Sequence, residues 1–168
     1  MFELRRLSSS AIPAALEKAM RYRLLNEPGE AESICRDILE LEPTNQEALS
    51  TFILVLTDQF PKGMGGRVNE AIDAVSRLEG EYTQAYHRGI ILERRGKCQY
   101  RTGSPACGYA AYDWLRKAME QYDEADRISP EGNDDAVLRW NACARLIMSH
   151  SDIQPEPEGM FEPPPMLE

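Results

Sequence analysis

Two cysteines, Cys98 and Cys107, come nearest to a metal or redox site in this sequence. They bracket the segment KCQYRTGSPACG and are nine positions apart. Zinc half-sites usually have a shorter spacing, and the chain offers only two histidines, His87 and His150, as further ligands. A disulfide that closes the segment is a second alternative. We favour a third interpretation, in which both are ordinary loop cysteines.

The remaining motifs predict no catalytic residue, cofactor or metal. The two histidines stand in the runs YHR and SHS, which offer no arrangement of nucleophile, base and orienting group. The pair Gly96-Lys97 lacks the flanking residues of a phosphate-binding loop, because Ile91 and Cys98 occupy their places. Cys35 and Cys143 lie within apolar helical stripes, where a thiol acts as a small hydrophobic group. We therefore assign no enzyme activity.

A cluster of basic residues stands out in a chain whose formal net charge is −9. It is broken only by Glu93, and it consists of Arg88, Arg94, Arg95, Lys97 and Arg101. The overall charge argues against nucleic acid as a partner, because phosphate neutralisation supplies most of that affinity. This cluster is interpreted either as a site for an acidic peptide or as a solvated helix end that complements the helix dipole.

Amphipathic helices are the elements that must position these residues. Apolar periodicity and turn residues predict helices at 14–25, 30–41, 47–59, 69–78, 83–95, 109–128 and 134–149, with enlarged loops at 61–67 and 96–108. The first of these loops, around Gly63, is interpreted as a turn that needs the positive φ values of glycine.

Small, aromatic and proline residues recur at repeat-like spacing in two of the predicted helix pairs. The first pair carries Ala19, Tyr22, Ala31 and Pro43, and the pattern partly returns at Gly89, Ala118, Ala125 and Pro130. The segment EPGEAESICRDILELEPTNQEAL resembles the tetratricopeptide repeat family, whose period is about 34 residues. The resemblance implies an all-α fold over residues 1–150: a right-handed superhelix of about 3.5 stacked helix-turn-helix repeats, closed by the last helix.

The same resemblance implies a peptide-binding groove lined by the first helix of each repeat, at 14–25, 47–59, 83–95 and 134–149. The positions that match the groove are Met20, Arg23, Ser50, Leu54, Tyr86, Ile90, Arg94 and Trp140. Some family members clamp a terminal carboxylate with basic and amide side chains, but Leu16, Met20, Ser50 and Thr51 stand at those positions. We therefore expect a more apolar peptide or helix. For Tyr86, Ile90 and Trp140, packing between helices is an equal alternative.

The segment 151–168 differs in composition from the rest of the chain. Residues 152–168 contain five prolines, five acidic residues and no basic residue. Such a segment alone is expected to be extended and flexible. Its apolar residues Met160, Phe161, Met166 and Leu167 are typical of recognition peptides, so it is also expected to dock on the basic cluster or to mediate self-association with a second copy.

These patterns predict a cytoplasmic protein that binds a protein or peptide partner. The first residues, MFELRRL, are too short and too charged for a signal peptide, and no apolar run approaches the length of a membrane span. An adaptor or scaffold is the favoured function. Two alternatives stay open: a cytoplasmic chaperone, similar to the acidic three-repeat chaperones of bacterial secretion systems, and an accessory subunit of an enzyme.

Overall fold

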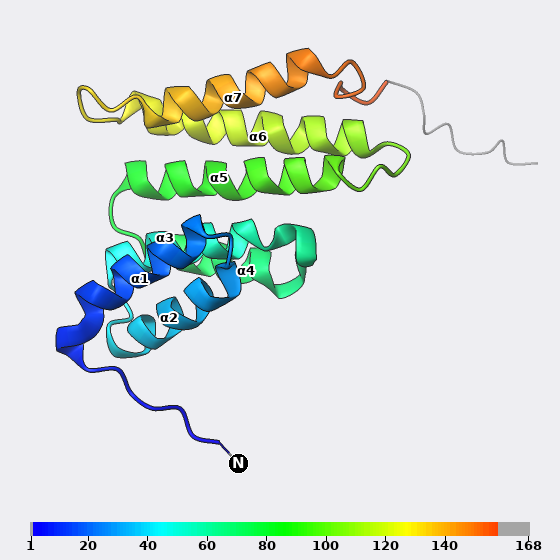
Figure 1. Ribbon diagram of the computed structural model, residues 1–168. Helices are drawn as coiled ribbons and strands as arrows, with labels where there is room; N and C mark the ends of the chain where they lie inside the picture. Colours follow the sequence, from blue (N-terminus) through cyan, green and yellow to red (C-terminus); the bar gives the residue numbers. More distant parts are fainter. Residues whose placement is uncertain (1, 158–168) are drawn as a thin grey trace, which may run out of the picture.

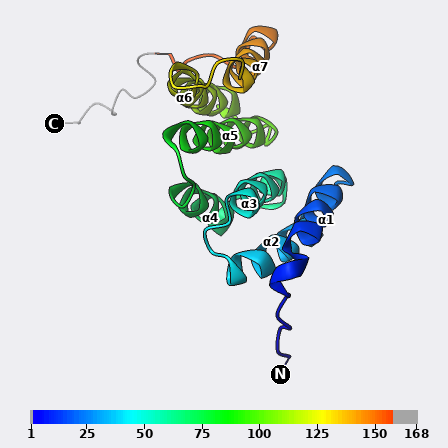
Figure 2. The ribbon, with the colours of Figure 1, turned by 90° about the vertical axis from the view of Figure 1, so that its left-hand side faces the viewer.

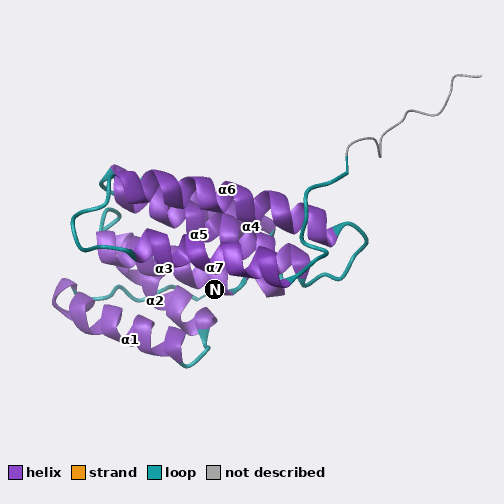
Figure 3. Ribbon diagram, turned by 90° about the horizontal axis from the view of Figure 1, so that it is seen from above, coloured by secondary structure: helices purple, strands orange, loops and turns teal. Residues whose placement is uncertain are grey.

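The chain folds into seven α-helices in the computed structural model, which describes residues 2–157 (Figure 1). They are α1 (Ile12–Leu24), α2 (Pro28–Leu41), α3 (Gln46–Asp58), α4 (Gly65–Ser76), α5 (Glu81–Tyr100), α6 (Cys107–Arg127) and α7 (Asp135–Ser149). Short 3-10 helices precede α1 at Ser9–Ala11 and follow α3 at Phe60–Lys62. The described residues contain no strand, as the ribbon of Figure 3 also shows, so the predicted all-α class is confirmed.

Each helix packs against the next one along the chain, and α3 also contacts α1 and α5. In Figure 2, α4 and α6 lie on one side of the molecule and α1, α3 and α7 on the other, while α5 extends across the middle and α2 lies below α3. Because α3 contacts both α1 and α5, residues of these three helices that are far apart in sequence lie close together. Within residues 2–157, no helix combines the length and the apolar character that a membrane span requires.

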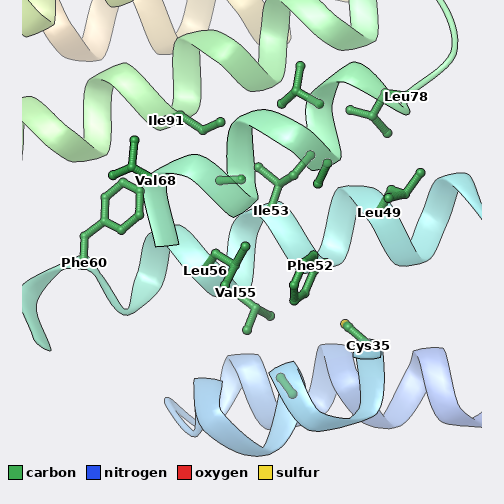
Figure 4. Close-up of a cluster of buried hydrophobic side chains, with 14 of the residues drawn as sticks. Cys35, Leu49, Phe52, Ile53, Val55, Leu56, Phe60, Val68, Leu78 and Ile91 are labelled. Carbon is green, nitrogen blue, oxygen red and sulfur yellow. The ribbon is translucent and has the colours of Figure 1, made fainter. Parts of the chain in front are cut away.

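The buried core consists of three clusters. One joins α1 to α2 and α3 through Ile12, Leu16, Ile38 and Ala48. A central cluster between α2, α3 and α4 contains Leu49, Ile53, Leu56 and Phe60, and it extends to Ile91 of α5 (Figure 4). The third fills the space between α5, α6 and α7, with Leu115, Tyr122, Ala136 and Cys143 at its centre. Ala19, Ala31, Ala118 and Ala125 are fully buried, which agrees with their expected role in close helix packing.

Helices α5 and α6 approach each other closely because α5 contains two glycines. A Cβ atom on Gly89 would lie 2.4 Å from the ring of Tyr122, and one on Gly96 would lie 3.2 Å from the side chains of Leu115 and Trp114. Gly96 is thus a packing residue inside a helix and does not end it. The predicted helix end near Arg95 is wrong, since α5 continues to Tyr100, and the predicted loop 96–108 shrinks to residues 101–106.

The loop at 61–67 is also shorter than its sequence predicts. Its first residues belong to the 3-10 helix, and α4 already begins at Gly65, four residues earlier than expected. Gly63 has a φ of 135°, so the expected need for a positive φ holds at this one position, while Gly65 and Gly66 are helical.

After α7 the chain folds back onto the loop between α5 and α6. Tyr100 donates a hydrogen bond from its hydroxyl to Asp152 Oδ1 at 3.1 Å, and Ile153 is only 3% exposed. A Cβ atom on Gly108 would lie 2.0 Å from the carbonyl oxygen of Asp152, so glycine is required there. The first residues of the predicted tail thus pack against the helices. Met160, Phe161, Met166 and Leu167 lie outside the described residues.

Candidate functional site

A hollow of about 610 Å³ lies where the C-terminal ends of α1 and α3 meet the C-terminal half of α5. It is lined by Arg23, Leu24, Asn26, Thr57, Asp58, Pro61, Lys62, Arg94, Lys97, Cys98 and Arg101. Five of these side chains are cationic and only Asp58 is anionic. The local charge is therefore opposite in sign to the formal net charge of −9 that the whole chain carries.

Asp58 lies at the centre of this hollow and connects three helices. Its Oδ2 accepts a hydrogen bond from Arg23 Nε of α1 at 2.6 Å, and its Oδ1 lies 3.1 Å from Arg94 Nη1 of α5. All three side chains are partly exposed to solvent. Asp58 is the last residue of α3, where the helix dipole disfavours a carboxylate. The two guanidinium groups offset that cost.

Three further cations line the hollow with fewer partners. Lys97 donates from Nζ to Glu93 Oε1 at 2.5 Å, whereas Lys62 and Arg101 are exposed and form no ion pair within residues 2–157. An anionic group that enters the hollow would thus meet unpaired cations, together with the two arginines that Asp58 holds in place.

The basic cluster seen in the sequence divides into two surfaces, because helix α5 extends through it. Lys97 and Arg101 follow Arg94 by three and seven residues, so the three side chains lie on one side of α5 and line the hollow next to α1 and α3. Arg88 and Arg95, seven residues apart, face a different cavity next to α4 and α6. The single cluster expected from the sequence is therefore two separate groups of cations.

A buried carboxylate, Glu93, holds α5, α6 and α7 together beside the hollow. It is 1% exposed, and its Oε2 accepts a hydrogen bond from the Tyr122 hydroxyl at 2.6 Å and lies 3.3 Å from Arg139 Nη1. Burial raises the pKa of Glu93, but hydrogen bonds from Lys97 and Tyr122 and the charges of Lys97 and Arg139 outweigh it, so that the pKa lies below its usual value. Glu93 is therefore ionised at neutral pH.

Of the groove positions expected from the sequence, the structure brings Arg23 and Arg94 together through Asp58. Met20 of α1 is half-buried, and its sulfur accepts from Thr51 Oγ1 at 3.6 Å. Ser50 and Leu54 are half-buried on α3, and Leu54 packs against the cluster of α5, α6 and α7.

The other three expected positions serve packing to different degrees. Ile90 is 1% exposed within the core, so a partner cannot reach it without a rearrangement. Tyr86 is half-buried; its ring stacks on Tyr82, and its hydroxyl accepts a hydrogen bond from Arg139. Trp140 lines a separate cavity of about 110 Å³ with residues of α6, and its indole nitrogen has no partner within residues 2–157.

Sequence reasoning missed Asp58, Lys62 and Arg139. A carboxylate at the end of an apolar helix is a usable signal for Asp58, because such a residue needs a cation to offset the helix dipole. Lys62 reaches the hollow through the 3-10 helix, which the sequence pattern did not predict. Arg139 carries no signal of its own, because its partner Glu93 is 46 positions away.

The four cysteines differ in burial and in their surroundings within residues 2–157. All four thiols are free, and no group of three or more His, Cys, Asp or Glu side chains is arranged to hold a metal ion in this part of the chain. Burial raises the pKa of Cys35 and that of Cys143 to about 12, which keeps both protonated. Cys98 lines the hollow, whereas Cys107 lies in another cavity at the hairpin of α5 and α6.

Comparison with known proteins gives no further guide to this site. None of the protein-family models matches the chain, and no curated protein or solved structure matches it either.

Proposed function

We propose that this protein is an adaptor that binds an acidic segment of a partner protein in the hollow between α1, α3 and α5. The observation that carries the proposal is the concentration of five cations around a single carboxylate, in a chain that is otherwise acidic. A hollow of this size suits a few side chains of a peptide. Electrostatic complementarity would guide the partner to this face and away from the acidic remainder of the surface.

The geometry supports a mechanism in which the partner's carboxylates join or replace Asp58. The arginine guanidinium groups bind carboxylates through paired, charge-assisted hydrogen bonds, and Asp58 keeps Arg23 and Arg94 oriented before binding. Leu24, which is 81% exposed, and Pro61 add apolar surface at the edge of the hollow. The best ligand is therefore a peptide that combines acidic residues with an apolar side chain.

The arrangement of the helices supports a tetratricopeptide-like architecture as part of the proposal. We infer that α1 to α6 form three helix-turn-helix units, with α7 as the closing helix, in a right-handed superhelix. The sequential packing of neighbouring helices and the contacts of α3 with both α1 and α5 favour this interpretation. Under it, the hollow lies on the concave face, and the protein acts in the cytoplasm.

Fluorescence anisotropy with two labelled peptides tests the proposal. One probe is a twelve-residue peptide of glutamates around a central leucine, and the other has lysines in place of the glutamates. We expect the acidic probe to bind, with an affinity that falls as salt rises, and the basic probe not to bind. The double variant R94E/R101E should weaken binding at least about tenfold.

A control with a single charge reversal uses the exposed Arg116 of α6, which does not line the hollow. The variant Arg116→Glu changes a surface charge in the same direction and should leave the affinity within about twofold. Equal affinity of the protein for both probes, or an equal loss for R94E/R101E and for Arg116→Glu, would contradict the proposal.

A further inference from the structure

An apolar cavity of about 320 Å³ lies between α4, α5 and α6, away from the hollow. It is lined by four apolar residues, Val68 and Ile72 of α4 and Ile91 and Leu92 of α5, and by three polar ones, Arg88, Arg95 and Gln121. Ile72 is 53% exposed, although it is a large apolar side chain. The cavity thus presents apolar surface that the described residues leave accessible, with basic side chains at its edge.

The basic side chains around this cavity are positioned but not neutralised. The guanidinium carbon of Arg95 lies 3.7 Å from the centre of the Trp114 ring, and Lys117 Nζ lies 4.8 Å from the same ring. Arg88 donates a hydrogen bond to Gln84. None of these three cations forms an ion pair within residues 2–157. An occupant with both apolar and acidic side chains would therefore fit.

We propose that the occupant is the C-terminal segment 158–168 of the same chain, EGMFEPPPMLE. This segment contains four large apolar residues, three glutamates and no basic residue. Its chemistry complements the cavity on both counts, because apolar side chains can enter the cavity while carboxylates reach Arg88, Arg95 and Lys117. Three successive prolines in the segment reduce the entropy that it loses on docking.

The position of the described chain end makes this docking possible within one molecule. Asp152 is fixed at Tyr100, and Ile91 lies nine residues earlier on α5, which corresponds to roughly 14 Å along the helix. The eleven residues of the segment can span up to about 35 Å. Figure 2 shows the described end of the chain beside α6, on the side where α4 also lies. The span of the segment therefore exceeds the distance along α5 that it has to cover.

The experiment compares the full chain with a chain that ends at Pro157. Hydrogen exchange of the amides in α4 and in residues 88–95 of α5 should be at least about threefold faster in the truncated chain. A labelled synthetic peptide of residues 158–168 should bind the truncated chain at least about tenfold more tightly than the full chain, where the site is already occupied. The peptide variant Phe161→Asp should not bind.

Two variants of the truncated chain locate the site. Ile72→Asp and Arg88→Glu should each weaken peptide binding at least about fivefold. Their controls are Met148→Asp and Arg21→Glu, which make the same changes at exposed positions away from the cavity and should leave binding unchanged. Circular dichroism melting of every protein variant checks that the fold is kept. The peptide variant Phe161→Asp needs no such check, because the protein itself is unchanged.

Three results would overturn the inference. The first is equal exchange protection in the full and truncated chains, and the second is peptide binding that Ile72→Asp and Arg88→Glu leave unchanged. The third is a dimer of the full chain that becomes a monomer on truncation, since the segment would then occupy a second copy. None of these results depends on the hollow between α1, α3 and α5, so the two proposals can fail separately.

Discussion

Glu93 is a fully buried carboxylate in a small helical protein, and its charge is maintained by the groups that surround it. The Tyr122 hydroxyl and the Lys97 ammonium group donate to it, and the Arg139 guanidinium group adds a second positive charge. The same environment raises the pKa of Tyr122, chiefly through burial and also through the charge of Glu93. The network links three helices, so its loss should affect stability more than a surface ion pair would.

The variant Glu93→Gln tests this network. We expect a loss of about 2–4 kcal/mol in the free energy of unfolding at pH 7, because buried cationic and hydroxyl groups lose their anionic acceptor. The pKa of Glu93 is lower in the folded state than its ordinary value of 4.5. The unfolded chain therefore binds the proton first, and the contribution of Glu93, full above about pH 4.5, is lost as the pH falls through the native pKa.

Urea denaturation at pH 7 and at pH 3.5 gives the measurement. The difference in unfolding free energy between the protein and Glu93→Gln should be smaller at pH 3.5 than at pH 7. The exposed Glu120 of α6 provides the control, and Glu120→Gln should change stability by less than about 0.5 kcal/mol at either pH. A constant difference across the two pH values would mean that folding leaves the pKa of Glu93 unchanged, and a larger difference at pH 3.5 would mean that folding raises it.

Asp58 provides a second prediction at the scale of the residue, one that concerns binding. The variant Asp58→Asn removes the only anion from the lining of the hollow but keeps its shape. We expect the acidic probe peptide to bind about three- to tenfold more tightly, because Arg23 and Arg94 are no longer neutralised. Anisotropy titrations measure this change, and weaker binding to Asp58→Asn would mean that Asp58 acts mainly by positioning the arginines.

At the scale of the element, the helices are more predictable than their ends. Apolar periodicity predicted all seven helices, because the buried stripe of each one is set by its own sequence. The end of α5 was not predictable, because a glycine that stops a helix and a glycine that admits a neighbouring helix look alike in sequence. Only the position of Leu115 and Trp114 on α6 shows that Gly96 is of the second kind.

The same limit applies to the candidate site. Arg23 and Arg94 could be placed on a common face, because the resemblance to tetratricopeptide repeats assigns both to the expected groove. Ile90 was assigned to that face as well, but it is buried in the core cluster of α5, α6 and α7. Asp58 pairs with cations 35 and 36 positions away in sequence, and no local pattern predicts such pairing.

The contact between Gly89 and Tyr122 yields a prediction for the pair α5 and α6. The variant Gly89→Ala places a Cβ atom 2.4 Å from the Tyr122 ring and should destabilise the protein by roughly 1–3 kcal/mol, despite the better helix propensity of alanine. Gly66 of α4 is helical too, but nothing lies within 4 Å of its Cβ position. Gly66→Ala is therefore the matched control and should be neutral or stabilising by up to about 1 kcal/mol.

Thermal denaturation distinguishes the two alanine variants. Gly89→Ala should melt well below the unmodified protein, while Gly66→Ala should melt at the same temperature or above it. Equal melting temperatures for the two variants would indicate that Tyr122 moves aside at little cost, and that the α5–α6 contact is looser than the structure shows.

At the scale of the whole molecule, an acidic protein carries two basic surfaces on different faces. One is the hollow between α1, α3 and α5, and the other surrounds the apolar cavity between α4, α5 and α6. Helix α5 contributes to both, because its cations alternate between two sides of the helix. Under the two proposals, the partner and the C-terminal segment would occupy different faces, and neither ligand would have to displace the other.

This separation predicts that the two surfaces can be inactivated independently. R94E/R101E should weaken binding of the acidic probe by the full chain at least about tenfold, but in the chain that ends at Pro157 it should leave binding of peptide 158–168 within about twofold. Arg88→Glu should leave binding of the acidic probe by the full chain within about twofold. In the chain that ends at Pro157, it should weaken binding of peptide 158–168 at least about fivefold. Two charge reversals change the net charge by the same amount wherever they are placed, so R88E/R95E is the matched partner of R94E/R101E. If both double variants weakened the binding of both ligands equally, the overall charge of the protein would govern binding, and neither surface would be a specific site.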